Sequence, residues 1–361
     1  MLSYRHAFHA GNHADILKHI ALTLALEKFK SKAKPFTVFD THAGAGIYDL
    51  CDERAVKTGE ADSGIKKLLS LPYSELPGEM HTYVDICRAY AKRGLYPGSP
   101  EIERCFMTQN DALILTELHN TEIDILKQNM KKEPLLQIRP KDENEGDVDD
   151  SRSGATEKLR PVRPHIHHRS GYEALRALSP PNIRRGFAVI DPSYEVQSDF
   201  SDTAQCIAEV HKRWSSGTIM LWYPLLTHKI QEISDMKRFI TAAAQSGNNM
   251  SETLDVQFIT DPSKERYGTA AKYESLQKNC AGLHCASAAA AAGAVTKTTI
   301  AAPNTAAFPA QTTVSRMYGS GLFFINPPYM LDTRLETILP FLVKEFSADG
   351  NGTGSFTIKK T

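Results

Sequence analysis

Short apolar runs with strand character alternate along the chain with longer segments of helical periodicity, and this alternation constrains the fold most strongly. Strands that alternate with helices predict parallel βαβ units and a doubly wound α/β sheet. Such a sheet binds its ligands beyond the carboxyl ends of its strands. The strand-like runs are PFTVFD (35–40), ALILTELH (112–119), GFAVIDPSY (186–194), TIMLWYPL (218–225), LDVQFITD (254–261) and GSGLFFINPPY (319–329).

The two ends of the chain carry further predictions about secondary structure. Residues 13–32 predict an amphipathic helix that ends before Pro35. The lysines from Lys28 to Lys34 are either the solvated end of this helix or a face that contacts phosphates. After the last strand, a helix to about Phe346 is followed by a frayed tail. The apolar side of the first helix is formed by Ile16, Leu17, Ile20, Leu24 and Leu26.

Two segments depart from the strand and helix pattern. Residues 139–165 hold an acidic block followed by a basic, histidine-containing block, with almost nothing apolar. Residues 281–313 are rich in Ala and Thr and carry almost no charge. Both compositions predict flexible insertions in the α/β core.

Composition excludes several protein classes. No apolar run approaches the roughly 18 residues of a membrane span, and the N-terminus is too polar and His-rich for a signal peptide. The formal net charge is zero, which argues against a protein coated in positive charge. The six cysteines lack zinc-ligand spacing, so we expect a reducing compartment and no metal. Cys280, His284 and Cys285 border the second insertion and are not taken as a metal site.

A glycine turn, THAGAG (41–46), follows the first predicted strand. Glycines there let the backbone approach a ligand closely, but the third glycine of a dinucleotide fingerprint is missing. Glu117, at the end of the next strand, offers a carboxylate that can accept both hydroxyls of a ribose. An adenosine without phosphates fits this pair best, and S-adenosylmethionine is such a ligand. From spacing alone a dinucleotide enzyme and a purely structural turn stay open as alternatives.

The strand GFAVI runs into Asp191-Pro192-Ser193-Tyr194. An exocyclic amine of adenine is a poor nucleophile because its lone pair is delocalised into the ring. Two acceptors, the Asp191 carboxylate and the Pro192 carbonyl, would favour a localised pair, and Tyr194 would stack on a flipped-out base. The methyl-transfer signature usually has a second proline where Ser193 stands, and Asp-Pro is also a common strand-terminating turn.

A second, similar motif, Asn326-Pro327-Pro328-Tyr329, follows the last strand. Asn-Pro-Pro-Tyr is itself a methyltransferase signature. The order along the chain favours Asp191, because it follows the glycine turn and the acidic strand as a fourth parallel strand would. Asn326 comes two strands later.

Together these motifs resemble one family closely, the bacterial 23S ribosomal RNA adenine-N6 methyltransferases of the RlmJ type. They occur in the family's order and cover nearly the whole chain outside the two insertions. The N-terminal string is the most specific of them. The motifs are MLSYRHAFHAGNHADILKH, FDTHAGAGIYDL, YPGSP, LTELH, GFAVIDPSYE, LWYP and GLFFINPPY.

The resemblance implies a single Rossmann-like methyltransferase domain over residues 1–361, with a helical subdomain inserted at 50–95. It implies that Asp191 lies at the methyl-transfer centre, that Tyr4 touches the RNA, and that His6 and Lys18 lie in the same catalytic region. Each of these residues also has a purely structural interpretation. S-adenosylmethionine would meet His19, His42, Ser99 and Glu117, together with Asp191.

One departure from the family lies at Ser170-Gly171. The family tends to have Asp-Gly there, contacting the adenine of the cofactor. Ser170 can still accept a hydrogen bond but lacks the carboxylate, and the insertion at 139–165 lies beside it.

The function predicted is N6-methylation of one flipped adenine of large-subunit ribosomal RNA, with S-adenosylmethionine and without a metal. A cytoplasmic location is expected, because the N-terminal motif begins at Met1 and leaves no room for a presequence. The protein is also expected to be a monomer. One alternative is an RNA-binding ribosome-assembly factor that kept the fold and lost catalysis. Another is methyl transfer to DNA adenine or to a protein amide.

Overall fold

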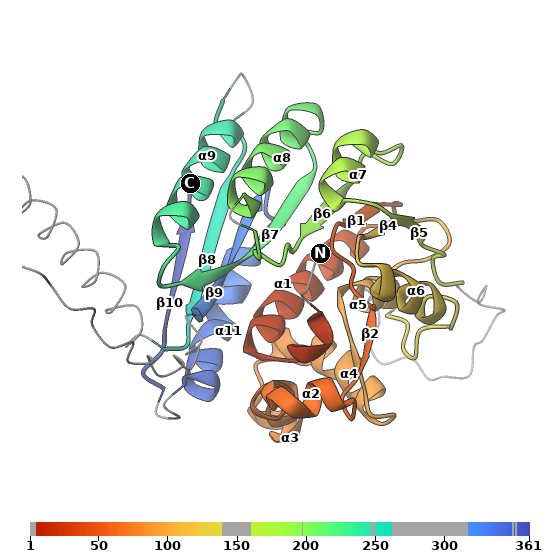
Figure 1. Cartoon of the computed structure of the whole chain (residues 1–361), viewed down its shortest axis with the longest axis vertical. Helices are drawn as coiled ribbons and strands as arrows, with labels where there is room; N and C mark the ends of the chain where they lie inside the picture. Colours follow the sequence, from red (N-terminus) through yellow and green to blue (C-terminus); the bar gives the residue numbers. More distant parts are fainter. Residues whose placement is uncertain are drawn as a thin grey trace, which may run out of the picture.

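In the computed structural model, eight strands of the described residues form one large sheet in the order β10-β8-β9-β7-β6-β1-β4-β5. Figure 1 shows this sheet with helices packed against it. The structure describes residues 5–138, 160–196, 198–246, 250–261, 317–348, 350 and 352–361. The strands are β1 (Thr37–Asp40), β4 (Ala112–Glu117), β5 (His165–His168), β6 (Gly186–Ile190), β7 (Thr218–Leu226), β8 (Thr253–Ile259), β9 (Met317–Ile325) and β10 (Ser355–Lys360).

Helices cover both faces of this sheet because successive strand side chains point to opposite sides. Val38 packs in one hydrophobic cluster and its neighbour Phe39 in the other. The sheet therefore has two cores, one on each face. The first cluster is completed by α1 (His13–Lys30), α5 (Ser99–Phe106), α6 (Asn120–Asn129) and α11 (Leu331–Phe346), and the second by α7 (Gly171–Leu178), α8 (Asp199–Arg213) and α9 (Ile230–Ala244).

Strand directions confirm the parallel prediction for five neighbouring strands and correct it at the other edge. β5, β4, β1, β6 and β7 pair in parallel. β9 runs antiparallel to both β7 and β8. The prediction of a frayed C-terminal tail is wrong, because residues 355–360 form β10, which pairs antiparallel with β8.

Helix α1 is not amphipathic in the folded protein, which corrects the sequence prediction. Every residue from Ala14 to Leu26 is buried, including Asp15, Lys18 and His19. The polar side is buried because α1 packs against α4 (His81–Ala91), α5 and α11. Its N-terminus is capped by Asn12, whose side chain accepts from the Asp15 backbone N–H.

Residues 50–95 form mainly short helices between β2 (Ile47–Asp49) and β3 (Leu95–Pro97), which pair antiparallel. This segment meets the N-terminal residues very closely. A Cβ atom on Gly64 would lie 2.0 Å from the Gly11 carbonyl oxygen, so only glycine fits. The helices are α2 (Glu53–Thr58), η2 (Asp62–Lys66), α3 (Lys67–Ser70), η3 (Tyr73–Glu75), η4 (Gly78–Met80) and α4.

Parts of several sequence predictions lie outside the described residues. These are Tyr4, the insertion at 281–313, the cysteines of the possible metal group, and most of the insertion at 139–165. The end of the latter is described and leads into β5 at His165. None of the helices within the described ranges has the length and apolar character needed to span a membrane.

Candidate active site

A cavity of about 510 Å³ lies where β1, β4 and β6 end. Carboxyl ends of neighbouring parallel strands share one edge of the sheet, which is why motifs far apart in sequence meet here. Every described residue that the sequence singled out for the site lines this cavity. These residues are His6, Lys18, His19, His42, Ser99, Glu117, Ser170, Gly171, Asp191, Pro192 and Tyr194.

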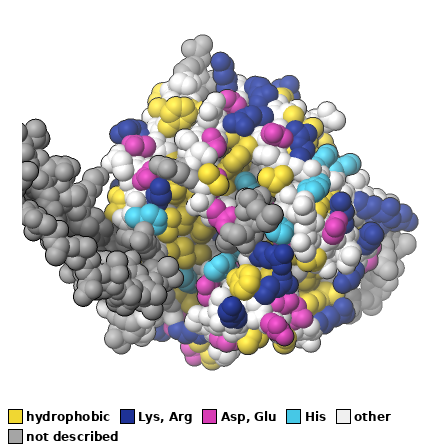
Figure 2. Space-filling view, viewed as in Figure 1, with side chains coloured by type: hydrophobic (Ala, Val, Ile, Leu, Met, Phe, Trp, Pro, Cys, Tyr) yellow, Lys and Arg dark blue, Asp and Glu magenta, His cyan; other side chains and the backbone are white. Residues whose placement is uncertain are grey.

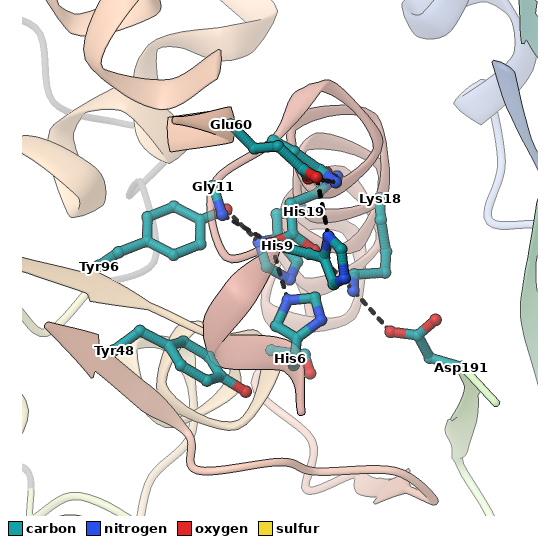
Figure 3. A network of polar contacts seen from close by, with 12 residues as sticks. His6, His9, Gly11, Lys18, His19, Tyr48, Glu60, Tyr96 and Asp191 are labelled. Atoms are coloured by element: carbon teal, nitrogen blue, oxygen red, sulfur yellow. Dashed lines mark hydrogen bonds and ion pairs between the residues drawn. The ribbon is translucent and has the colours of Figure 1, made fainter. Parts of the chain in front are cut away.

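Asp191 follows β6 directly, and its carboxylate is held by Lys18 from α1 (Figure 3). The Lys18 Nζ atom donates to Asp191 Oδ2 at 2.6 Å and lies 2.9 Å from Asp15 Oδ1. Burial by itself lowers the pKa of Lys18, but the two carboxylates outweigh it and raise that pKa above its ordinary value. Lys18 is therefore a charged donor at neutral pH and not a base.

Asp15 is a site residue that sequence reasoning missed. Its Oδ2 atom accepts from the Gly11 backbone N–H at 2.8 Å and lies 2.9 Å from His6 Nε2. Burial opposes its ionisation, but the charges of His6 and Lys18 hold the pKa of Asp15 well below the usual range. The available signal was the spacing Asn12-x-x-Asp15, which resembles a helix capping box.

Two histidines of the site, the buried His19 and the half-buried His42, are neutral at pH 7. Burial lowers the pKa of His19 to about 3 and that of His42 to about 4. His19 Nδ1 lies 2.7 Å from the Tyr96 hydroxyl, and His42 Nδ1 lies 2.8 Å from the Thr41 hydroxyl. Both imidazoles can therefore hydrogen-bond to a ligand without adding charge.

The glycine turn is braced by Glu117. Its Oε2 atom accepts from the Gly44 N–H at 2.8 Å, and Oε1 accepts from the His119 N–H at 2.6 Å. The Leu118 backbone N–H also interacts with this carboxylate, so at least one of its four lone-pair sites is left for a ligand. Gly44 has φ +56°, and a Cβ atom there would lie 2.3 Å from the Tyr48 hydroxyl.

Ser99 is supported from behind by Asp40, a second residue that the sequence did not single out. The Ser99 hydroxyl donates to Asp40 Oδ2 at 2.6 Å, and the His42 backbone N–H donates to Oδ1 at 3.1 Å. Asp40 is fully buried, and burial raises its pKa to about 6. Its position at a strand end, directly before the glycine turn, was the signal available in the sequence.

Tyr194 is fixed in an uncommon backbone conformation. Its φ is +53°, a region that non-glycine residues rarely occupy and that clusters at functional sites. The hydroxyl donates to the Trp222 carbonyl at 3.0 Å, and the ring lies 4.5 Å from that of Phe200. The side chain is therefore held as a preformed aromatic wall of the cavity, beside the half-buried Ser193.

The second motif lies away from this site. Asn326 donates through Nδ2 to the Ser215 and Gly217 carbonyls at 2.7 and 3.0 Å, just before β7 begins. Because β9 runs antiparallel to β7, the carboxyl end of β9 lies at the opposite end of the strands from the cavity. Tyr329 is 75% exposed there. Asp191 lines the cavity, whereas Asn326 does not.

Ser170 and Gly171 line the cavity at the start of α7. Ser170 is the N-cap residue, but its side chain makes no capping hydrogen bond. Gly171 also has a packing role, since a Cβ atom there would lie 2.1 Å from the Thr41 carbonyl oxygen. The helix can approach the glycine turn this closely only because Gly171 has no side chain.

Comparison with known proteins gives a consistent result. Residues 33–151 and 144–272 match the protein family described as "Ribosomal RNA large subunit methyltransferase D, RlmJ". "Ribosomal RNA large subunit methyltransferase J" of Escherichia coli (strain K12) is 30% identical over 355 residues, which cover 98% of this chain and 96% of that protein. The protein of the same name from Haemophilus influenzae is 30% identical over 363 residues, covering 99% and 98%.

A solved structure supports the fold. The crystal structure of protein LPL1258 from Legionella pneumophila superposes with a TM-score of 0.68 at 24% identity, and the match covers 97% of this chain and 98% of that one. The mixed sheet with helices on both faces is therefore also present in an experimental structure.

Proposed function

The chain belongs to the RlmJ family of ribosomal RNA large subunit methyltransferases, and we propose that it methylates N6 of an adenine in large-subunit ribosomal RNA with S-adenosylmethionine. One observation carries the proposal to the level of residues. Asp191, at the end of β6, shares a single cavity with the glycine turn and Glu117. Methyl donor and target amine can therefore be brought together at one carboxylate.

The lining of the cavity fits S-adenosylmethionine, which carries a positive sulfur, two ribose hydroxyls and an amino group. The described lining residues include six carboxylates and one lysine, an excess of negative charge that suits a cation. Glu122 Oε1 is buried at this wall and accepts no hydrogen bond from any described residue. A hydroxyl or ammonium of the ligand would satisfy it. His19, His42, Ser99 and Glu117 would hold the rest of the ligand.

Two acceptors on the Asp-Pro turn would activate the target amine. Lys18 occupies Asp191 Oδ2 and so leaves Oδ1 to accept one N6–H. The Pro192 carbonyl would accept the other, which keeps the nitrogen lone pair directed at the methyl group. S-adenosylmethionine supplies an electrophilic methyl carbon bonded to a positive sulfur. The N6–C bond would form as the C–S bond breaks, the bonding pair would stay on sulfur, and one N6 proton would pass to solvent.

Tyr194 would receive the adenine. N6 takes part in base pairing in a duplex, so the base must be rotated out of its stack to reach Asp191. The fixed ring of Tyr194 offers a stacking surface that needs no reordering when the base arrives. Tyr4 and His6, at the N-terminus, would contact the RNA beside it. Replacement of the second proline by Ser193 leaves both acceptors and the ring in place.

The test replaces Asp191 with Ala. We expect methyl transfer to ribosomal RNA to fall by about 100-fold or more, while calorimetry shows S-adenosylmethionine still bound. Asp62→Ala, at a side chain that is 64% exposed, is the control and should retain full activity. Undiminished turnover by Asp191→Ala would overturn the assignment. Bound cofactor without methylation of RNA by the wild-type protein would favour the assembly-factor alternative.

Two further properties stay predictions. We expect a monomer, which size-exclusion chromatography with light scattering would test, and a cytoplasmic location, which fluorescent tagging would test.

A further inference from the structure

Asp15 is a buried carboxylate that lines the cavity and has several partners, and the proposed reaction gives it no role. It is 2% exposed and contacts three groups: the Gly11 N–H, His6 Nε2 and Lys18 Nζ. Lys18 in turn reaches Asp191. His6, Lys18 and Asp191 lie around one point of the site in Figure 3, with a dashed line joining Lys18 to Asp191.

The balance of charge explains why a second carboxylate would be needed. A lysine paired with Asp191 alone would form a neutral pair and cancel the negative charge next to the reacting methyl group. With Asp15 on the other side of Nζ, the two carboxylates and one ammonium together carry a net charge of −1, to which His6 adds a positive charge only when its imidazole is protonated. Because Asp15 is itself buried, water screens its charge less than it would screen a surface charge.

We propose that Asp15 is a positioning residue for methyl transfer. It shares the Lys18 ammonium with Asp191, fixes the direction from which Lys18 binds Asp191 Oδ2, and preserves a negative charge for the sulfonium. This inference rests on the proposed function, and it assigns to Asp15 an action through Lys18 rather than contact with the substrate.

A purely structural role is the competing explanation, because Asp15 lies in the first turn of α1 and accepts from Gly11 N–H. Asp15→Asn separates the two. The amide oxygen can still accept from Gly11 while the charge is removed. Lys18→Met removes the opposite charge at the same place.

Ligand binding gives the first measurement. S-adenosylmethionine carries the sulfonium, whereas S-adenosylhomocysteine is neutral at sulfur. The Kd of S-adenosylmethionine divided by that of S-adenosylhomocysteine therefore reports the charge near that atom. Calorimetry should show this ratio raised by about 10-fold in Asp15→Asn and lowered in Lys18→Met. A structural role would move both ligands alike. Equal changes for the two ligands in Asp15→Asn would overturn the proposal.

A double-mutant cycle on kcat gives the second measurement. Asp15→Asn should lower kcat about 10- to 100-fold in the wild-type background, and by less than about 3-fold once Lys18 is Met. Equal factors in both backgrounds would mean that Asp15 does not act through Lys18. If wild-type protein methylates no RNA, the proposed function fails, while the ratio of Kd values still tests the charge arrangement.

Discussion

Asp40 combines complete burial with a charge, and this combination predicts a trade between stability and activity. It lies at the end of β1, where it accepts from the Ser99 hydroxyl and the His42 N–H. Burial raises its pKa from 3.8 to about 6, although both hydrogen bonds act in the opposite direction. We predict that Asp40→Asn raises the free energy of unfolding at pH 8 and weakens the binding of S-adenosylmethionine.

The magnitude follows from the pKa of Asp40. Between about pH 4 and pH 6 the folded chain retains a proton that the unfolded chain has lost, so stability falls as the pH rises through this window. A difference of about two pKa units corresponds to a loss of about 3 kcal/mol in the free energy of unfolding, and the loss is complete above pH 6. Asn is nearly isosteric and uncharged. Asp40→Asn should therefore gain about 1–3 kcal/mol at pH 8 and much less at pH 4.5.

Urea unfolding at pH 8 and pH 4.5 measures this gain for wild type and Asp40→Asn. Asp62→Asn, on an exposed side chain, is the control and should follow wild type at both pH values. A variant that is no more stable than wild type at pH 8, or equally more stable at both pH values, would refute the reasoning. Calorimetry with S-adenosylmethionine checks the functional half, because Ser99 loses a charged acceptor.

Two further predictions concern packing and stacking. Gly171→Ala places a methyl group 2.1 Å from the Thr41 carbonyl oxygen and should lower the free energy of unfolding, measured by urea titration, by about 2 kcal/mol or more. The control Gly78→Ala, whose added Cβ has no neighbour within 4 Å, should leave that free energy unchanged. Tyr194→Ala should lower kcat/KM for RNA about 10- to 100-fold through lost stacking. Tyr329→Ala, at the opposite end of the strands, should leave kcat/KM unchanged, and equal losses in the two variants would contradict the choice between the two motifs.

The sequence was most informative where function depends on strand ends. The glycine turn, Glu117 and Asp191 each follow an apolar run, and parallel pairing brings these ends to one edge without further information. Strand direction was harder to predict, because the local pattern of β9 is the same whether it runs parallel or antiparallel. β10 was missed because its six residues follow a short segment rich in Gly and Asn.

The interior of α1 could not be predicted from its pattern. An amphipathic helix places lysine on the solvated side, so Lys18 looked like a surface charge, yet its partner Asp191 lies 173 residues away in the chain. The packing of α4, α5, α11, η2 and β9 around α1 buries its polar side as well. Asp15 and Asp40 were missed for the same reason, since their importance comes from tertiary contacts that span the site.

The central claim is that this cavity transfers a methyl group to adenine N6 at Asp191. The most direct measurement incubates wild-type protein and Asp191→Ala with S-adenosylmethionine labelled in its methyl group and unmodified large-subunit ribosomal RNA, followed by nucleoside mass spectrometry. The account predicts labelled N6-methyladenosine with wild type and none with the variant. Label on another nucleoside, or equal N6-methyladenosine from both proteins, would contradict it.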